Sequence, residues 1–516
     1  MTRNYFSENQ NLQDVIHYRI DIDLYPAEKK IKCTTDITLV ANGDLDSIDL
    51  NFYDNFLISS FQVNGKPSVY TNRGTRLSFP NSAEPGDTII VSVSYEGEPV
   101  RAGLSAFTFG EYNGDPVVYN MSEPVYASTW FPCNDLPDDK ALLDILITNE
   151  SKYTSVSNGV LIAETEKQGR STYHWRTFYP ISTYLIAVYS ANYTSFSEKY
   201  YSETTQDSME ILYYAFPDHM DNAKKDFSGH PGMISVFAGL FGEYPFIKEK
   251  YGVAEFLWQQ GAMEHQTIIG IGSNFVSGRN FFKDVYVHEL AHHWWGNAVG
   301  PATWKDIWLN EGFATYSEAL YYEALYGEDA LHSTMQAKFQ SYFSGTLYDP
   351  GKNIFSTTVY DKGAWVLHML RKQTGDVNFF RILQTYFERF KYSNASTEDF
   401  KKVCEEITQT DLKKFFDQWI YKGIGQISIL YDWKYESVED AEVIEINIDQ
   451  TQKEYDVYEF PLDIEIVYPG DVRERKNVFI SERNTELKLI VKEKPVQIIP
   501  DPNGWLLANI SEKQGN

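Results

Sequence analysis

The sequence is poor in cysteine and has no long hydrophobic run. Only three cysteines occur among 516 residues, at Cys33, Cys133 and Cys404, and their wide spacing fits neither a disulfide framework nor a zinc knuckle. We therefore expect three inert thiols. Apolar runs such as Tyr184–Val188 are far shorter than the roughly 20 residues that span a bilayer. The sequence thus argues against a disulfide-stabilised fold and against a membrane-spanning helix.

Positive charge is also scarce. Lys and Arg total 45 against 72 Asp and Glu, so the formal net charge is -27, and the acidic residues are spread along the chain. This balance disfavours nucleic acid and anionic membranes as partners and suits cationic or amino-bearing ligands. The opening residues, MTRNYFSENQ, contain no apolar stretch, so no signal peptide is visible. We expect a cytoplasmic protein; the alternative is an exported or periplasmic protein whose leader has been removed.

Hydrophobic periodicity divides the chain into three parts. Residues 1–205 alternate apolar and polar side chains, as around Ile20 and Ile22, which predicts an antiparallel β domain. Residues 206–425 show helical spacing, and residues 426–516 alternate again. A chain of this length is also expected to form about three domains. The predicted fold class is multidomain α+β: an N-terminal β domain, a mostly helical middle domain and a C-terminal β-sandwich.

Two helix ends are marked by residues that cap helices. One helix follows Tyr360 and should end at Gly375, because glycine readily supplies the backbone conformation of a C-terminal cap. Another should begin after Ser396, because Asp399 stands three residues later and the pair resembles a capping box. Both predictions fall in the helical middle part.

The segment HELAHHWWGN, His288–Asn297, carries the strongest chemical signal. His288 and His292 are four residues apart, so on a helix their imidazoles share a face and can reach one Zn²⁺ at about 2.0 to 2.1 Å. Glu289 follows the first histidine, where it can take a proton from a water that the metal polarises. His293 points about 100° away from His292, so we expect it to pack or to act as a supporting donor.

A catalytic zinc needs a third protein ligand and an open fourth position. Glu311, in WLNEGFATYSEAL, follows His292 after 18 intervening residues, and an antiparallel neighbouring helix would bring its carboxylate to the metal. Two His and one Glu form the ligand set of a hydrolytic site rather than a structural one. Glu318 shares the helix face of Glu311, and its role is either to orient a ligand or to pack or be solvated. We expect one Zn²⁺ per chain.

Several motifs occur together in one order and spacing. They are GAMEH (Gly261–His265), HELAHHWWGN, WLNEGFA (Trp308–Ala314), VYDKGA (Val359–Ala364) and the lesser signatures FPCNDLP (Phe131–Pro137) and FGEYPF (Phe241–Phe246). Together they resemble the zinc aminopeptidases related to aminopeptidase N and leukotriene hydrolase, which are gluzincin metallopeptidases. The resemblance covers nearly the whole chain. It implies a saddle-like β domain (1–205), a thermolysin-like catalytic domain (206–425) and a β-sandwich (426–516).

Larger relatives in this family add a C-terminal helical domain that covers the cleft. The present sequence shows no such segment, so it resembles a short form of the family. We therefore expect a more open active site than in the larger relatives.

The resemblance also implies roles for individual residues. Glu264 matches the glutamate that binds the free α-amine of the substrate, on an edge strand that pairs with the substrate backbone. Glu123 matches a second amine-binding residue from the N-terminal domain; the alternative is an exposed acid in a loop. Tyr360 matches the tyrosine that stabilises the developing oxyanion. The resemblance also implies that Gly261, Ala262 and Met263, which precede Glu264 in the motif, bind the substrate.

One position departs from the family pattern. The motif usually ends in Asn, which helps to hold the substrate backbone, whereas this sequence has His265. An imidazole there would hydrogen-bond a peptide carbonyl, titrate near neutral pH or narrow the pocket. Because Glu264 is present, the resemblance implies a zinc aminopeptidase acting on peptides with a free N-terminal amine. The alternatives are a zinc endopeptidase or other amide hydrolase, an epoxide hydrolase as in one branch of the family, and a non-catalytic scaffold.

Overall fold

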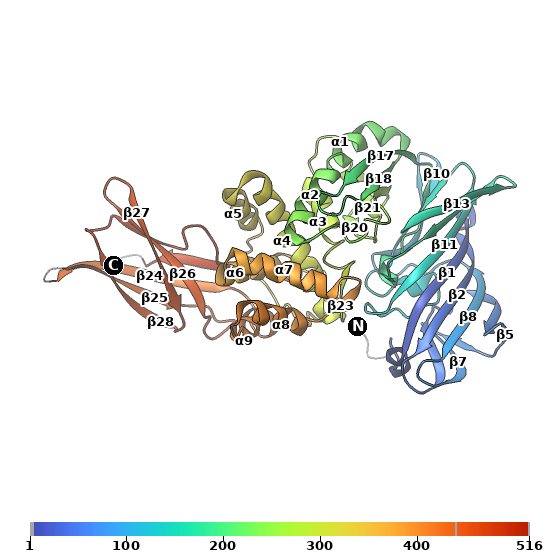
Figure 1. Cartoon of the computed structure of the whole chain (residues 1–516), viewed down its shortest axis with the longest axis horizontal. Helices are drawn as coiled ribbons and strands as arrows, with labels where there is room; N and C mark the ends of the chain where they lie inside the picture. The colour runs from blue at the N-terminus through green and yellow to red at the C-terminus, as the bar shows by residue number, and fades with distance from the viewer. Residues whose placement is uncertain (1–4, 439–440, 514–516) are drawn as a thin grey trace. The chain divides into compact units, whose positions relative to one another are not determined.

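The computed structural model describes residues 5–438 and 441–513, which form two compact units (Figure 1). Unit 1 runs to Trp304 and includes Phe390–Ala395; unit 2 holds Lys305–Arg389 and the chain from Ser396. Within the described residues no helix combines the length and apolar character needed to cross a membrane. The border between the units lies inside the predicted catalytic domain, so the predicted domain limits stay predictions.

Unit 1 begins with a large β-sheet in the order β13-β14-β11-β1-β2-β8-β4-β5, with β15 paired to β11 (Figure 1). The alternating residues Ile20 and Ile22 of β1 are fully buried, as the sequence predicts. The strands are β1 (Gln13–Tyr25), β2 (Lys30–Ala41), β4 (Leu57–Val63), β5 (Lys66–Pro67), β8 (Thr88–Gly97), β11 (Lys140–Glu150), β13 (Val160–Lys167), β14 (Arg170–Arg176) and β15 (Ile181–Ser182).

One pairing in this sheet corrects the antiparallel prediction. β1 is antiparallel to β2 but parallel to β11, with His17 opposite Leu142 and Asp23 opposite Thr148. A parallel neighbour needs a long connection, which the chain between β1 and β11 supplies. Side-chain alternation has the same period in both kinds of pairing, so the sequence pattern does not distinguish them.

Two smaller sheets complete the N-terminal β domain, in the orders β12-β16-β10-β9 and β3-β7-β6. The first matters for the site, because β10 ends two residues before Glu123 and β16 begins with Tyr189. The strands are β3 (Leu45–Asn51), β6 (Thr71–Arg73), β7 (Arg76–Ala83), β9 (Ser105–Tyr112), β10 (Asp115–Met121), β12 (Thr154–Val156) and β16 (Tyr189–Ala191).

The rest of unit 1 is a five-stranded sheet, in the order β17-β18-β19-β21-β20, with three helices. β18, β19 and β21 are parallel, and every residue of β19 is buried, as is usual for a parallel strand. The last strand, β20, is antiparallel and forms the edge. The elements are β17 (Thr194–Tyr201), β18 (Ser208–Ala215), α1 (Met220–Phe227), α2 (His230–Phe241), β19 (Tyr251–Phe256), β20 (Ala262–Met263), β21 (Ile269–Gly272) and α3 (Lys283–Ala291). Short strands β22 (Val299–Pro301) and β23 (Ser393–Ala395) pair with each other.

Unit 2 contains the helices that follow, and both predicted helix ends are confirmed. α6 stops at Gly375, whose φ of 76° lies in the left-handed region. α8 begins after Ser396, which forms a capping box with Asp399. The helices are α4 (Trp308–Tyr326), α5 (Glu328–Ala337), α6 (Gly363–Thr374), α7 (Asp376–Phe390), α8 (Thr397–Thr408) and α9 (Lys413–Phe416), with π-helical turns at Thr358–Lys362 and Asp417–Tyr421.

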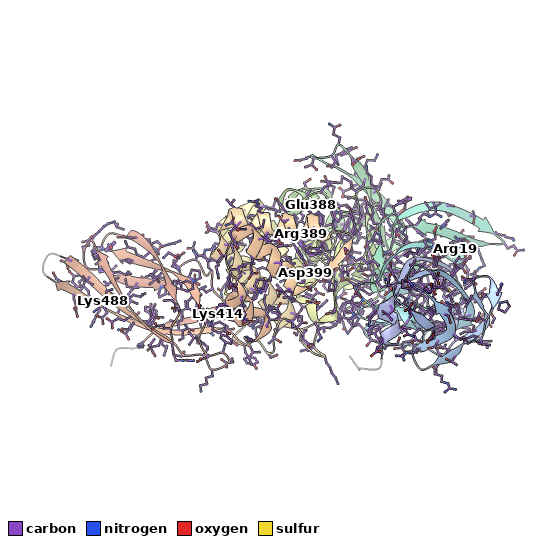
Figure 2. The ribbon with its side chains drawn as sticks, turned by 60° about the horizontal axis from the view of Figure 1, so that its bottom comes forward. Arg19, Glu388, Arg389, Asp399, Lys414 and Lys488 are labelled. Atoms are coloured by element: carbon purple, nitrogen blue, oxygen red, sulfur yellow. The ribbon has the colours of Figure 1, made fainter. Side chains whose placement is uncertain are left out.

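The chain ends, still in unit 2, in two small sheets that confirm the predicted C-terminal β domain. Their orders are β28-β25-β24-β30 and β27-β26-β29. Ile444, Ile446 and Ile448 are fully buried, whereas Lys488 on β28 is exposed (Figure 2). The strands are β24 (Ile427–Val438), β25 (Ala441–Gln450), β26 (Phe460–Tyr468), β27 (Val472–Ile480), β28 (Asn484–Val491), β29 (Gln497–Pro500) and β30 (Ala508–Glu512).

Candidate active site

The two histidines of the HELAHHWWGN segment lie at the end of α3. His288 is in the last turn of the helix and His292 is its C-terminal cap residue. Their Nε2 atoms are 3.1 Å apart. His292 Nδ1 lies 3.0 Å from the Trp295 carbonyl oxygen, which cannot donate, so Nδ1 carries the proton and Nε2 is an acceptor. The chain thus sets the tautomer that a metal-binding imidazole requires.

This pair of nitrogens fits a zinc ion. Two ligands at about 2.0 to 2.1 Å from a tetrahedral Zn²⁺ are about 3.3 Å from each other. The observed 3.1 Å separation of the His288 and His292 nitrogens is close to that value. Imidazole nitrogens are also among the donors that Zn²⁺ prefers in proteins. The residues present therefore fit the metal.

Two buried glutamates stand beside His292. One carboxylate oxygen from each of Glu264 and Glu289 lies within 4.8 Å of a His292 ring nitrogen and of the other. Glu289 comes from α3 itself, and Glu264 follows edge strand β20. The arrangement places a proton acceptor and a second negative charge next to the candidate metal ligand.

The edge strand that leads to Glu264 is short and tightly enclosed. Ala262 and Met263 pair with β21, and Gly261 continues the strand backwards, accepting a hydrogen bond from the Gly272 N–H at 3.1 Å. A Cβ on Gly272 would lie 2.1 Å from the Trp258 carbonyl oxygen, so only glycine fits there. The other side of β20 is the edge of the sheet, where an extended peptide can pair.

Glu123 contributes a further carboxylate from the N-terminal β domain. It lies in the segment after β10, and only 8% of it is exposed. A Glu123 oxygen lies within 4.8 Å of a Glu264 oxygen. The alternative of an exposed loop acid is therefore wrong. Its role in amine binding stays a prediction.

Two more histidines, His265 beside Glu264 and His293 beside His292 in the sequence, are fully buried. Burial lowers the pKa of each to about 3. His265 therefore does not titrate near neutral pH, which removes that alternative. His293 Nε2 accepts a hydrogen bond from the Thr267 N–H at 3.0 Å, and Nδ1 donates to the Glu289 carbonyl oxygen at 3.3 Å. The prediction that His293 packs and supports the site is confirmed.

Asn297 is a supporting residue that the sequence reasoning missed. Its Nδ2 donates to the Glu264 carbonyl oxygen at 2.7 Å, and its own N–H donates to the His292 carbonyl oxygen at 2.9 Å. Asn297 thus joins the amine-binding candidate to the metal-binding candidate. Asn297 is the last residue of HELAHHWWGN, but the sequence alone does not show which backbone carbonyl groups its side chain and N–H will bond.

Lys140 was missed in the same way. It begins β11 in the N-terminal β domain, and its Nζ donates to the carbonyl oxygens of Asn297, Ala298 and Ser393 at 2.8, 3.1 and 2.8 Å. Burial lowers the pKa of Lys140 to about 7. This one side chain fixes the turn that follows the two histidines to the β domain.

The remaining candidates belong to unit 2. Glu311 lies in the first turn of α4 and is buried, and Tyr360 lies in the π-helical turn before α6. The two helices approach closely, because a Cβ on Gly312 would be 2.9 Å from the Gly363 Cα. Glu311 directly precedes Gly312, and Tyr360 lies three residues before Gly363, so both candidates are close in sequence to this helix–helix contact.

Of the expectations for Glu318, the solvated one is wrong and packing is supported. It is buried on α4 and forms an ion pair with Lys338 at 2.6 Å. That contact gives it a packing role within unit 2. The three cysteines are buried and free, as expected.

Two domains of known protein families match this chain. The Peptidase M1 N-terminal domain matches residues 15–185, and the Peptidase family M1 domain matches residues 233–419. The leucyl aminopeptidase of Saccharolobus solfataricus is 25% identical over 469 residues, which cover 86% of this chain and 56% of that protein. Human endoplasmic reticulum aminopeptidase 1 is 27% identical over 60% of this chain and 36% of its own length. The chain spans about half the length of the first of these curated relatives.

Solved structures give the same result. The M1 zinc metallopeptidase of Deinococcus radiodurans has a TM-score of 0.69 and 25% identity, covering 79% of this chain and 93% of that one. Legionella pneumophila aminopeptidase A has a TM-score of 0.87 over 99% of this chain and 61% of that one, at 18% identity, and shows the shared fold. The two family domains together match more than half of the sequence. The chain belongs to the peptidase M1 family.

Proposed function

We propose that this protein is a zinc-dependent aminopeptidase that hydrolyses the N-terminal peptide bond of peptides. The proposal is carried by one observation: carboxylate oxygens of Glu264 and Glu289 lie within 4.8 Å of each other and of His292. With the substrate ammonium at Glu264 and the general base Glu289 this close to it, the peptide bond that lies next to the base is the first one after the free N-terminus. Two-domain M1 zinc metallopeptidase structures that are 25% identical to this chain were solved with L-tryptophan and with L-arginine.

The proposed metal ligands are His288, His292 and Glu311. The first two are supported by their 3.1 Å nitrogen separation, and Glu311 by its burial, its sequence spacing and the family motif WLNEGFA. Bound Zn²⁺ would supply Lewis-acid polarisation of the carbonyl and of the attacking water.

The chain's own residues do the rest of the chemistry. Glu289 takes a proton from the attacking water and passes it to the leaving amine. Glu264, with Glu123 beside it, holds the substrate ammonium, and the edge strand β20 pairs with the substrate backbone. Tyr360 donates a hydrogen bond to the oxyanion; this role is supported by its motif and by its place in a π-helical turn, a feature common at functional sites.

The test is hydrolysis of a panel of aminoacyl-coumarin substrates, each in free and N-acetylated form. The protein would be assayed zinc-loaded, chelator-treated and as the Glu289→Gln variant. We expect fast turnover of free-amine substrates, at most slow turnover of the N-acetylated ones, and none in either control, because the ammonium is part of what the site binds. The panel also gives the side-chain preference at the first position.

Two other outcomes would contradict the proposal. Equal cleavage of the acetylated substrates, or of internal bonds in blocked peptides, would identify a zinc endopeptidase. No cleavage by zinc-loaded protein would leave a non-catalytic scaffold. The cytoplasmic location, the more open active site and the absence of nucleic-acid partners stay predictions.

A further inference from the structure

The side chain of His265, the residue that departs from the family motif, has one hydrogen-bond partner within the described residues. The Tyr189 hydroxyl lies 2.5 Å from His265 Nδ1, and both side chains are fully buried. Tyr189 belongs to β16 of the N-terminal β domain, whereas His265 follows the edge strand β20. The hydrogen bond therefore joins the β domain to the end of the strand that carries Glu264.

The surrounding chain is shaped for this contact. A Cβ on Gly270, which pairs with Met263 in the sheet, would lie 2.3 Å from the Tyr189 hydroxyl oxygen. Glycine at that position is what lets the hydroxyl reach His265. We call the hydrogen bond between these two side chains, with Gly270 packed against the hydroxyl, the Tyr189–His265 contact.

The charge state of both groups follows from their burial. Burial lowers the pKa of His265 to about 3 and raises the pKa of Tyr189 well above its usual value, with nearby Tyr193, Glu289 and Glu264 adding to the rise. The imidazole is therefore neutral and the hydroxyl protonated. The hydrogen bond between the Tyr189 hydroxyl and His265 Nδ1 therefore joins two uncharged groups.

The residues around His265 are held to the same domain one after another. Asn158 Nδ2 donates to the Gln266 carbonyl oxygen at 2.6 Å, and the Gly159 N–H donates to Thr267 Oγ1 at 2.9 Å. On the other side, Asn297 holds the Glu264 carbonyl oxygen. His265 is the residue directly after Glu264, and it is held by its side chain, through the Tyr189 hydroxyl. The bonds to Gln266 and to Glu264 instead hold backbone carbonyl oxygens.

We propose that His265 is a positioning residue, which acts through Tyr189 to fix the Glu264 carboxylate where it binds the substrate ammonium. The proposal rests on the proposed aminopeptidase function. A shift of about 1 Å at Glu264 weakens its hold on the amine, whereas Glu289 and His288 lie on a different element, α3, which the Tyr189–His265 contact does not touch. Loss of the contact should thus act on substrate binding more than on turnover.

The experiment compares Tyr189→Phe with Tyr193→Phe. Tyr193 is the matched control, because its hydroxyl donates to the Glu255 carbonyl oxygen at 2.7 Å and does not touch His265. For a leucyl-coumarin substrate, we expect Tyr189→Phe to raise KM about threefold to tenfold with kcat changed less than about twofold. Tyr193→Phe should leave both within about twofold.

Substitutions at His265 give a second measurement. An Asn side-chain amide can still hydrogen-bond the Tyr189 hydroxyl, so His265→Asn should raise KM less than His265→Ala. Selective ¹⁵N labelling of histidine should show that His265 is neutral at pH 7 in wild type, and this readout does not depend on activity.

The outcomes separate the two claims. An active wild type whose KM is unchanged in Tyr189→Phe and in His265→Ala, with only the melting temperature lowered, would show a purely structural contact and overturn the positioning role. A wild type that cleaves no free-amine substrate would instead overturn the proposed function, and the positioning role with it.

Discussion

Negative charge is the shared property of the residues around His292. Oxygens of Glu289 on α3 and of Glu264 after β20 lie within 4.8 Å of His292, and an oxygen of Glu123 after β10 lies within 4.8 Å of a Glu264 oxygen. Burying several carboxylates together costs desolvation and mutual repulsion, and a bound cation reduces both. The arrangement is suited to two cations, a divalent metal and a substrate ammonium.

The first prediction concerns Glu289. Replacing it with Gln keeps the shape of the side chain but removes the proton acceptor, so kcat should fall by about 10² to 10⁴. Zinc content should stay at one per chain, because the carboxylate is a base and not a ligand. Steady-state kinetics and metal analysis of the same sample check both statements. A kcat within tenfold of wild type would exclude Glu289 as the general base.

The second prediction concerns Glu264. Glu264→Gln should raise KM for free-amine substrates about tenfold or more, because a charge-assisted contact to the ammonium is lost. N-acetylated substrates carry no ammonium, so their slow turnover serves as the internal control and should change little. The ratio of kcat/KM for the two substrate forms is the measured quantity. An unchanged ratio would place the amine elsewhere.

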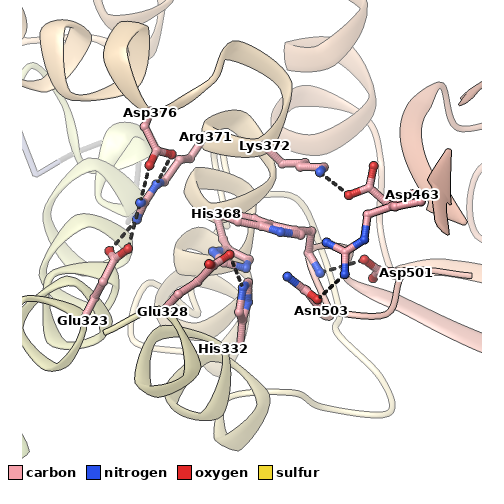
Figure 3. A network of polar contacts seen from close by, with 12 residues as sticks. Glu323, Glu328, His332, His368, Arg371, Lys372, Asp376, Asp463, Asp501 and Asn503 are labelled. Atoms are coloured by element: carbon pink, nitrogen blue, oxygen red, sulfur yellow. Dashed lines mark hydrogen bonds and ion pairs between the residues drawn. The ribbon is translucent and has the colours of Figure 1, made fainter. Parts of the chain in front are cut away.

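At the scale of elements, α6 is fixed at its C-terminal end by a polar network within unit 2 (Figure 3). Arg371 makes two hydrogen bonds to Glu323 on α4, at 2.6 and 2.8 Å, and two to Asp376 at the start of α7. One turn earlier, His368 stacks on Trp505 of the C-terminal β domain, with ring centroids 4.3 Å apart. Lys372 adds an ion pair to Asp463 on β26. The network holds the helix that follows Tyr360.

The third prediction tests this network. Arg371→Ala should lower the free energy of unfolding by about 3 to 5 kcal/mol, because it leaves Glu323 without its bidentate partner in a largely buried place. Arg389 on α7 is the matched control: its side chain is 41% exposed and forms an ion pair with Glu406 (Figure 2). Arg389→Ala should cost about 0 to 1 kcal/mol.

Thermal and urea unfolding of both variants would be compared with wild type at one pH and one zinc concentration. Equal destabilisation by the two substitutions would show that the network contributes no more than a surface ion pair. A further loss of kcat in Arg371→Ala at a temperature where it is folded would indicate that the position of Tyr360 depends on α6.

Features set by local interactions were predictable from the sequence. The end of α6 at Gly375 and the start of α8 at Ser396 depend on hydrogen bonds within one turn. The 3.1 Å pair of His288 and His292 depends on helical spacing alone. Such features leave a pattern in consecutive residues.

Contacts between distant segments leave no such pattern. The Tyr189–His265 contact joins residues 76 apart, and Lys140 reaches Asn297 across 157 positions. The parallel pairing of β1 with β11 was likewise outside the reach of periodicity. Glu123 and Glu264 were found only through their motifs, since nothing in their local sequence distinguishes them from other acids. Family resemblance thus supplied the distant part of the site, and the structure supplied the residues that hold it.

At the scale of the whole molecule, stability should depend on pH through buried neutral histidines. His230 is the clearest case outside the site. It begins α2, is fully buried, and packs against the rings of Tyr213, Tyr251 and Tyr286. Its Nδ1 donates to the Phe227 carbonyl oxygen at 2.5 Å. Burial lowers the pKa of His230 to about 4, from an ordinary value of 6.5.

The sign of the fourth prediction follows from these two pKa values. Between pH 6.5 and 4 the unfolded chain binds a proton at His230 and the folded chain does not, so the free energy of unfolding falls as pH falls. The slope approaches about 1.4 kcal/mol per pH unit for one proton, or roughly 3 kcal/mol over the whole window. Above pH 6.5 the histidine is neutral in both states and contributes no slope.

His230→Asn isolates this contribution, because the Asn amide can still donate to the Phe227 carbonyl oxygen but does not titrate. Above pH 6.5 the variant should be less stable than wild type, since it loses ring contacts. Its melting temperature should fall less steeply than that of wild type between pH 6.5 and 4, while the two curves run parallel above pH 6.5. Parallel curves over the whole range would mean that His230 takes up its proton in the folded protein as readily as in the unfolded chain. The acid sensitivity would then arise from other groups, among which the buried His265 is the next to replace.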